Sequence, residues 1–513
     1  MKIKTKSNAT FIDLFSGCGG FSAGLEAAGW TCLAGIDNNP KAIDTFSENH
    51  SKDTISLAKD LTEFNPEDLA ELIKVKHIDL IVGGPPCQGF SSARQSAGSN
   101  SGHRLVIDPR RELYKIFLKY INFFRPKIFV MENVLGIKKN QNGKYFTAIQ
   151  NEARNIGYRV ISFEVKTWEY GVPQKRVRQL FIGTLIDLPI FIPDEMIKKT
   201  HSLESGCKKL LPFVSLGEAI MDLPELGAGD ERVIQDYDLK LRNRYLQKYS
   251  GSFLSDILNI ANSNKLTWHC SRPHSERDLR DFSRLLEGET CSRALKRGVE
   301  MEFPYDKSTF KDRYTRQSRD GLCSTIVAHL KADGLMFIHP TQVRSLTPRE
   351  AARIQTFPDT YKFVGSRSHV FTQIGNAVPP LVGKALGKGA LSYLSSLKHH
   401  ISLPKLLNTE KTKLVLKLEV LVNKHQIESI ENTSDSEFKR IWELVRRLLP
   451  HLHPESIKDN GVEITMIPSR EVSFCFEPYF IRSGWPVELT PIAVEANNRY
   501  KSGRISSKEY FHN

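Results

Sequence analysis

The segment TFIDLFSGCGGFSAGLEAAG, residues 10–29, determines how the chain begins to fold. Its first six residues form a short apolar run typical of a buried strand, and residues 21–28 have apolar side chains at helical spacing. The glycines between them permit a tight turn and allow a ligand to approach the backbone. The segment departs from the dinucleotide pattern G-x-G-x-x-G, because Ser22 occupies its last position. On its own, it is as consistent with a plain glycine turn as with a cofactor-binding loop.

The alternation of strands and helices continues to about residue 184. Strands are predicted at residues 31–36, 54–58, 78–82 and 127–131, and helices at residues 39–48, 67–75 and 113–124. Repeated strand–helix units predict an α/β fold with a doubly wound, mostly parallel sheet and helices on both faces. Amphipathic helices are also predicted at residues 343–355 and 379–397.

The chain divides into four predicted parts. Residues 1–184 form the first part of an α/β domain, and residues 185–340 lose its rhythm and are interpreted as an inserted mixed domain. Residues 341–398 are predicted to complete the first domain. Residues 399–513 form a C-terminal extension of unknown role, with an amphipathic helix predicted at residues 437–449.

Composition limits the class of protein. The 513 residues carry a net charge of +14, of which +7 falls in residues 1–184 and +6 in residues 341–398. This distribution favours a polyanionic partner. No segment approaches the roughly 20 apolar residues of a membrane helix, and eight cysteines without a CxxC pair predict neither a disulfide scaffold nor a metal site. We therefore expect a cytoplasmic protein.

Two acidic residues strengthen the case for a cofactor at the first motif. The second strand leads to Asp37, twenty residues after Gly17, where a carboxylate can accept hydrogen bonds from ribose hydroxyls. The alternative is that Asp37 caps the helix that begins near Pro40. Asp60, after the third strand, is placed to meet an adenine amino group or to cap a turn. Together the two motifs favour an adenosine-containing cofactor.

The segment GGPPCQGFS, residues 83–91, follows a strongly predicted buried strand. Two prolines stop that strand and place Cys87 on a rigid turn at the carboxyl end of a central parallel strand, where ligands bind in such sheets. A thiolate in this position is a candidate nucleophile. The alternative is a small, buried, apolar cysteine, which the prolines and the polar loop after them make less favoured.

Two further segments carry candidate site residues. In MENV (131–134), Glu132 ends a strand at the same sheet edge as Cys87 and is a candidate proton donor. In QKRVR (174–178), Arg176 and Arg178 share one strand face, where their guanidinium groups suit a phosphate or a base carbonyl. A solvated strand end is the alternative for each.

Six segments resemble, in the same order, the motifs of the DNA (cytosine-5) methyltransferase family. They are FIDLFSGCGGFSAGLEAAG (11–29), GGPPCQGFS (83–91), MENV (131–134), YGVPQKRVRQLFIG (170–183), HPTQVRSLTPREAARIQTFPD (339–359) and QIGNAVPPLVGKALG (373–387). The resemblance covers residues 10–184 and 320–395. It implies that residues 185–340 are a target-recognition region and that the last motif supplies the final strand and helix. One departure is Arg111, where the family commonly has glycine.

The resemblance also implies a reaction. A methyl group would pass from S-adenosylmethionine to C5 of a cytosine flipped out of double-stranded DNA, with Cys87 bonded to C6 of the base. Glu132 would hold the base edge and assist protonation at N3, Arg178 would contact the cytosine carbonyl, and Arg176 would lie near Glu132 and a phosphate. The residues that map onto family cofactor contacts are Phe15, Gly17, Gly19, Asp37, Asn38, Asp60, Leu113 and Asn376.

The family further suggests a bacterial restriction–modification methylase that acts as a monomer on DNA. A cognate restriction endonuclease would share the target site, without any implied contact. Nine arginines between Arg272 and Arg319 alternate with acids, so we expect some to make structural salt bridges and some to reach guanine edges.

Two alternatives remain open. One is an RNA cytosine-5 methyltransferase, whose branch of the family has a small recognition region with a Cys-Phe-Thr motif that is absent here. The other is a catalytically inactive DNA-binding module, which should have lost Cys87 or Glu132.

Overall fold

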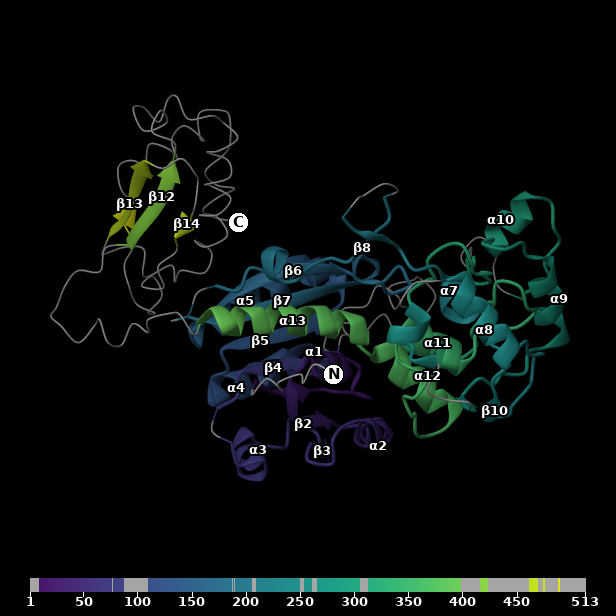
Figure 1. The fold of residues 1–513 in the computed structure, drawn as a ribbon, viewed down its shortest axis with the longest axis horizontal. Helices are drawn as coiled ribbons and strands as arrows, with labels where there is room; N and C mark the ends of the chain where they lie inside the picture. The colour runs from purple at the N-terminus through teal and green to yellow at the C-terminus, as the bar shows by residue number, and fades with distance from the viewer. Residues whose placement is uncertain are drawn as a thin grey trace.

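The computed structural model describes residues 9–75, 77–86, 109–186, 188, 190–204, 209–249, 253–260, 265–304 and 312–397, and four strands beyond residue 415. The N-terminal part of the chain forms a seven-stranded sheet, in the order β3-β2-β1-β4-β5-β7-β6 (Figure 1). Its strands are β1 (Thr10–Leu14), β2 (Thr31–Asp37), β3 (Ile55–Ala58), β4 (Leu80–Gly83), β5 (Ile128–Asn133), β6 (Tyr158–Lys166) and β7 (Val177–Leu185).

The first five strands are parallel, and β7 runs antiparallel to both β5 and β6. The doubly wound, mostly parallel α/β sheet is thus confirmed, as are the five strands predicted before residue 132. The edge strand β6 was not predicted, because its mixed sequence YRVISFEVK gives neither a clean alternation nor an unbroken apolar run.

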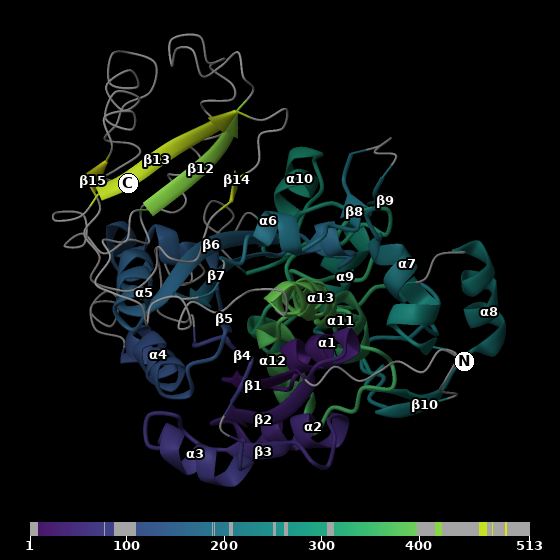
Figure 2. The same cartoon turned by 60° about the vertical axis from the view of Figure 1, so that its left-hand side comes forward.

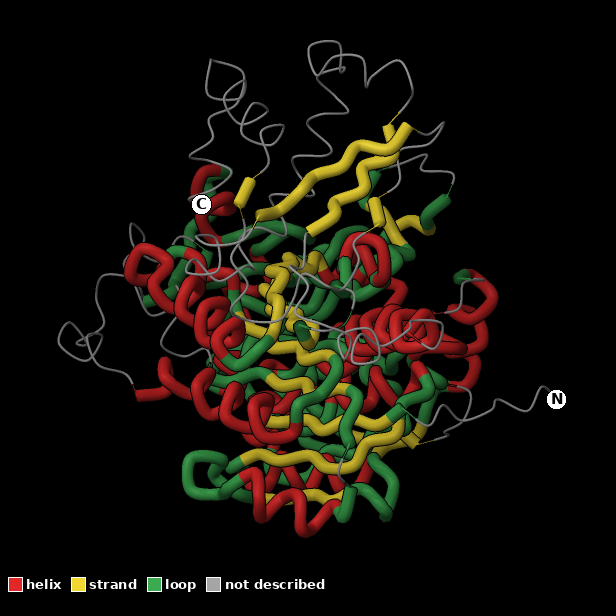
Figure 3. Tube along the Cα trace, turned by 90° about the vertical axis from the view of Figure 1, so that its left-hand side faces the viewer, coloured by secondary structure: helices red, strands yellow, loops and turns green. Residues whose placement is uncertain are grey.

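Helices cover both faces of the sheet, and Figure 3 shows the strands between two helical layers. The helices are α1 (Gly20–Ala28), α2 (Pro40–Asn49), α3 (Pro66–Ile73), α4 (Leu113–Phe124), α5 (Lys144–Asn155) and α13 (Pro380–Leu397). Successive strand side chains point to opposite layers. Ile12 packs with α3, α4 and α5, whereas Phe11 packs with α1, α2 and α13. We call this body, residues 9–204 together with α13, the sheet lobe.

Helix α13 brings residues 380–397 back to the beginning of the described chain. It lies along α1 in Figures 1 and 2. The two helices approach closely because glycines face the contact: a Cβ on Gly24 would lie 2.2 Å from the Pro380 carbonyl oxygen. The indole of Trp30 donates a hydrogen bond to the Gly387 carbonyl at 2.9 Å. The last motif was expected to return to the sheet as a strand followed by a helix. In the structure, only the helix α13 returns to it. The expected final strand is wrong, because residues 373–376 finish a helix.

A second lobe, residues 211–376, contains mostly short elements (Figure 1). They are α7 (Leu216–Ile220), β10 (Ile234–Asp236), α8 (Leu239–Lys248), β11 (Lys265–Thr267), α9 (Glu276–Arg284), α10 (Cys291–Lys296), η8 (Ala328–Lys331), α11 (Pro348–Ile354) and α12 (Arg367–Asn376). Side chains of α7, β11, α11 and α12 share one hydrophobic core. The packing thus changes at α13, and not at residue 341 where the sequence suggested a boundary.

Beyond residue 415, four strands form a separate sheet in the order β14-β12-β13-β15. They are β12 (Leu416–Val422), β13 (Gly461–Pro468), β14 (Phe474–Cys475) and β15 (Glu488–Leu489). The helix predicted at residues 437–449 lies outside the described residues. Among the helices that the structure describes, none is long and apolar enough to cross a membrane.

Candidate active site

The chain makes a tight turn between β1 and α1, as the glycine motif predicted. Phe15, Gly17 and Gly19 all have positive φ, at 59°, 55° and 88°. A Cβ on Gly17 would meet no atom within 4 Å, so this side of the turn is open to a ligand. A Cβ on Gly19 would instead lie 2.3 Å from His50 Nε2. Gly17 therefore leaves space for a cofactor beside the turn, and at Gly19 packing against His50 also requires glycine.

Asp37 ends β2 and holds this turn. Its Oδ2 accepts a hydrogen bond from the Gly17 backbone N–H, and its Oδ1 accepts one from the Asn39 N–H, both at 2.9 Å. The alternative role as helix cap is wrong, because the side chain of Asn39 caps α2. Burial raises the pKa of Asp37, and the two N–H donors oppose that shift. A carboxylate has about four lone-pair sites, so two remain for ribose hydroxyls.

Asn38 and Asp60 lie together next to this turn. Asp60 accepts hydrogen bonds from the backbone N–H and the hydroxyl of Thr62, at 2.9 and 2.7 Å, and it also bonds the side chain of Asn38. The Thr62 N–H lowers the pKa of Asp60. Asp60 therefore caps a turn, and it is exposed beside Asn38 at the carboxyl ends of β2 and β3. Leu113, half-buried, is the first residue of α4.

The carboxyl end of α12 lies against the same glycine turn. Cys18 Sγ contacts the Gln373 carbonyl at 3.6 Å, and the Tyr361 hydroxyl donates to the Cys18 carbonyl at 2.5 Å. A Cβ on Gly20 would lie 2.4 Å from the Val378 carbonyl oxygen. Asn376, exposed at the end of α12, is thus brought from the far end of the chain to the predicted cofactor residues.

Glu132 and Arg178 form an ion pair at the neighbouring strand ends. Arg178 Nε lies 2.9 Å from Glu132 Oε1, and their side chains are 16% and 12% exposed. A Cβ on Gly84 would lie 3.4 Å from Glu132 Oε2, so the turn after β4 passes beside the carboxylate. The structure therefore brings Glu132, Arg178 and the start of the GGPPC turn together.

Cys87 itself lies outside the described residues, but the turn that leads to it is described as far as Pro86. The amide of Asn133, the residue after Glu132, donates a hydrogen bond to the Pro85 carbonyl at 3.4 Å. Asn133 is 2% exposed. The MENV motif therefore anchors the cysteine-bearing turn as well as supplying the acid.

Arg176 has a different place from the one expected. Its guanidinium donates to the carbonyls of Ile326 at 2.9 Å, Gly375 at 3.3 Å and Ala377 at 3.1 Å, and the residue is 1% exposed. A side chain enclosed in this way is not presented to a phosphate, so we correct that expectation. Arg178 makes the ion pair with Glu132. Arg111, which replaces the family's glycine, is also buried.

Two buried glutamines at this junction were not singled out from the sequence. Gln174 donates to the Ile354 carbonyl and the Gln355 side chain, and its Oε1 accepts from the Ile326 N–H. Gln355 donates to the carbonyls of Ile374 and Ala377. Both lie inside the quoted motifs, but the contacts of Gln174 join residues 150 or more positions apart and leave no local pattern.

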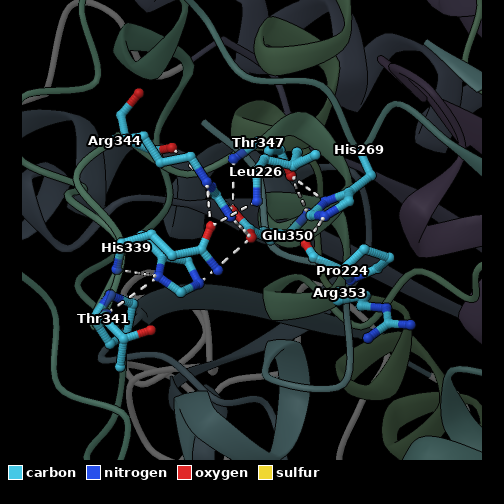
Figure 4. A network of polar contacts seen from close by, with 12 residues as sticks. Pro224, Leu226, His269, His339, Thr341, Arg344, Thr347, Glu350 and Arg353 are labelled. Carbon is cyan, nitrogen blue, oxygen red and sulfur yellow. Dashed lines mark hydrogen bonds and ion pairs between the residues drawn. The ribbon is translucent and has the colours of Figure 1, made fainter. Parts of the chain in front are cut away.

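A charged network holds the HPTQVRSLTPREAARIQTFPD motif (Figure 4). Glu350 accepts hydrogen bonds from both Nη atoms of Arg344, at 2.9 and 2.7 Å, and from the Thr347 N–H at 2.7 Å. His339 Nε2 lies 3.6 Å from Glu350, and His269 contacts Thr347. Burial opposes ionisation of Glu350, but Arg344 overcomes it and holds the pKa well below its usual range. This motif organises the second lobe.

Eight of the nine arginines between residues 272 and 319 make hydrogen bonds or ion pairs within the protein, as expected for part of the set. Arg316, for example, is buried and donates to the His339 and Phe282 carbonyls. The ninth, Arg293, is exposed on α10.

Known proteins resemble this arrangement along most of the chain. The family model for C-5 cytosine-specific DNA methylase matches residues 9–391. Type II methyltransferase M.DdeI of Desulfomicrobium norvegicum is 35% identical over 404 residues, which cover 75% of this chain and 89% of that protein. Type II methyltransferase M.AgeI of Thalassovita gelatinovora is 30% identical over 434 residues, covering 74% and 98%. The solved structure of a prophage-encoded candidate DNA modification methyltransferase from E. coli has a TM-score of 0.59 and 26% identity, covering 76% of this chain and 100% of that one.

The open glycine turn and the carboxylate of Asp37 fit an adenosine-containing cofactor, and the family model and the solved structure make this chain an S-adenosylmethionine-dependent methyltransferase. Within that class, the chain belongs to the C-5 cytosine-specific DNA methylase family, of the type found in bacterial restriction–modification systems. It is a DNA (cytosine-5) methyltransferase.

Proposed function

We propose that this enzyme methylates a cytosine in one specific sequence of double-stranded DNA after flipping that base out of the helix. The observation that carries the proposal is the ion pair between Glu132 and Arg178 beside the turn that leads to Cys87. C6 of a stacked cytosine is inaccessible to a protein thiolate, so the base must leave the stack. The type II relatives favour the role of a restriction–modification methylase, and we propose that the enzyme works as a monomer in the cytoplasm.

The chemistry assigns one role to each residue. The Cys87 thiolate forms a bond to C6 of the base, while Glu132 holds the base edge and supports a proton at N3. The electron density that the thiolate adds makes C5 nucleophilic. After C5 has taken the methyl group, its proton passes to a base such as water and the C6–S bond breaks with its electrons going to sulfur, which releases the Cys87 thiolate and 5-methylcytosine. Arg178 orients Glu132 and contacts the base carbonyl.

S-adenosylmethionine, when bound, supplies the methyl group as an electrophile. The residues proposed to hold it are Phe15, Gly17, Gly19, Asp37, Asn38, Asp60, Leu113 and Asn376. The open face of Gly17 and the carboxylate of Asp37 fit a nucleoside, because one admits it to the backbone and the other accepts from its hydroxyls. The basic excess of residues 1–184 favours contact with DNA phosphates, which predicts weaker binding at high salt, whereas Arg344, Arg349 and Arg353 in residues 341–398 are buried.

The test is to trap the proposed bond. DNA copied with 5-fluorodeoxycytidine triphosphate carries fluorine at C5 of each cytosine in the new strand. Because this fluorine cannot leave as the proton does, the cysteine cannot be eliminated from C6. The unchanged enzyme with cofactor should form an adduct that survives denaturation, Cys87→Ser should form none, and Glu132→Gln should form it more slowly. An adduct that persists in Cys87→Ser, or none with the unchanged enzyme, would contradict the proposal.

A further inference from the structure

The guanidinium of Arg176 is placed between the two halves of the active site. Arg176 immediately precedes β7, and Arg178, two residues later, pairs with Glu132. Arg176 itself donates to the carbonyls of Gly375 and Ala377, which are the residues on either side of Asn376. The start of β7 therefore has two contacts. Arg178 contacts Glu132, and Arg176 contacts residues 374–377, which we call the Asn376 segment.

The Asn376 segment needs such an anchor. The last four carbonyls of a helix have no partner within it, and α12 ends at Asn376. Gln355 binds the carbonyls of Ile374 and Ala377, and Arg176 binds those of Gly375 and Ala377. A cation at a helix carboxyl end is also favoured by the helix dipole. The two side chains together fix the carbonyls of three residues around Asn376.

The Asn376 segment also packs directly against the glycine turn between β1 and α1. A Cβ on Gly375 would lie 2.2 Å from the Ala328 nitrogen, so the end of α12 has no room to move toward η8. On its other side, the Val378 carbonyl lies against Gly20, which opens α1. The segment held by Arg176 is therefore clamped between η8 and the turn that contains Gly17.

We infer that Arg176 is a positioning residue for the cofactor, which acts by fixing the backbone around Asn376 and does not touch DNA. This inference rests on the proposed role of Asn376 in holding S-adenosylmethionine. It gives the two neighbouring arginines separate tasks: Arg178 serves the base and Arg176 serves the cofactor. Lysine at position 176 would keep the charge but lose the planar fork that reaches several carbonyls at once.

The test is the affinity for S-adenosylhomocysteine without DNA, measured by calorimetry on full-length protein. Arg176→Lys should weaken binding by about tenfold or more, since it loses at least one charge-assisted hydrogen bond to the segment. Its KM for S-adenosylmethionine should rise while kcat at saturating cofactor changes little. The matched control Arg178→Lys should bind S-adenosylhomocysteine normally and lose kcat. Because this measurement needs neither DNA nor Cys87, it stays informative if the covalent mechanism fails.

A double-mutant cycle separates positioning from a general loss of structure. If Arg176 acts through Asn376, the variant Arg176→Lys/Asn376→Ala should bind no more than about twofold worse than Asn376→Ala alone. Gln355→Asn, too short to reach both carbonyls, should reproduce the Arg176→Lys phenotype if the lysine variant does not fold. Unchanged affinity in folded Arg176→Lys, or losses that multiply in the double variant, would overturn the inference.

Discussion

The two lobes of this enzyme bury different kinds of side chain. In the sheet lobe, alternate residues of each strand pack against two apolar helical layers, and Asp13 is a buried acid bonded to Ser22. In the second lobe, the short helix α11 buries Arg349, Glu350 and Arg353 completely. The sheet lobe has a core of periodic apolar contacts, whereas the second lobe combines a hydrophobic core with buried ion pairs, one of which joins Arg353 to Asp222.

This difference bears on where the proposed chemistry lies. A parallel sheet offers fixed strand ends, and the predicted chemistry of Asp37, Glu132 and the GGPPC turn lies at those ends. A lobe made of short elements has no such regular edge. Its shape is set by buried charges at α11, so the exposed loops around them can differ while the scaffold is kept.

The largest expected effect is removal of Arg353. Its guanidinium contacts Asp222 and Asp359, both at 2.5 Å, with all three side chains inaccessible to solvent. Arg353→Met removes the cation that both buried carboxylates share and leaves Asp359 with only the longer ion pair to Arg349 at 3.9 Å, which should cost about 3–5 kcal/mol of stability. Urea unfolding followed by tryptophan fluorescence measures the loss. A change below about 1 kcal/mol would mean that apolar packing holds this lobe as well.

The buried Asp13 of the sheet lobe should make the free energy of unfolding depend on pH. Burial raises the pKa of Asp13 from 3.8 to about 7, despite a hydrogen bond from Ser22. Between those values the folded state keeps a proton that the unfolded state has lost, so the free energy of unfolding should fall as pH rises. A tenfold change in an acid dissociation constant corresponds to about 1.4 kcal/mol, so Asp13 can account for at most about 4 kcal/mol of this fall.

The variant Asp13→Asn cannot ionise and isolates this contribution. Its urea midpoint should vary less between pH 4 and 7 than that of the unchanged protein, and the two curves should diverge toward pH 7. Parallel curves over that range would show that Asp13 is ionised in the folded state.

A smaller effect is expected from overpacking the sheet. A Cβ on Gly183 of β7 would lie 2.0 Å from the Phe129 ring, which is fully buried. Gly183→Ala should therefore cost about 1–3 kcal/mol. Gly227→Ala is the matched control in the second lobe, because a Cβ there would meet no atom within 4 Å. Equal melting temperatures for the two variants would show that β7 can shift to accept the methyl group.

The smallest effect concerns the surface of the second lobe. Arg280 pairs with Glu302 at 2.7 Å, but its side chain is 53% exposed. Exposed ion pairs contribute little because water and salt screen them. Arg280→Ala should leave the melting temperature within experimental error at physiological salt. A clear decrease in melting temperature would mean that exposed ion pairs stabilise the second lobe as the buried pairs do.

The sequence predicted the sheet lobe well, because buried parallel strands and their crossover helices repeat a local pattern. The same pattern placed the candidate residues Asp37 and Glu132 at the ends of such strands, as the structure has them. The second lobe was not predictable, since Arg353 finds Asp222 131 residues away and no period marks the pair. The role of Arg176 was missed for the same reason: its position in the motif suggested a neighbour of Glu132, and only the fold brings residue 326 and the end of α12 to it.

The most direct test of the central claim is bisulfite sequencing of DNA from cells that express this chain, beside cells that express Cys87→Ser. We predict methylation at C5 of cytosine in one short sequence, lost in the variant. Methylation of DNA that persists in Cys87→Ser, or a parent sample with no methylated sequence while total RNA from the same cells carries 5-methylcytosine, would contradict the account.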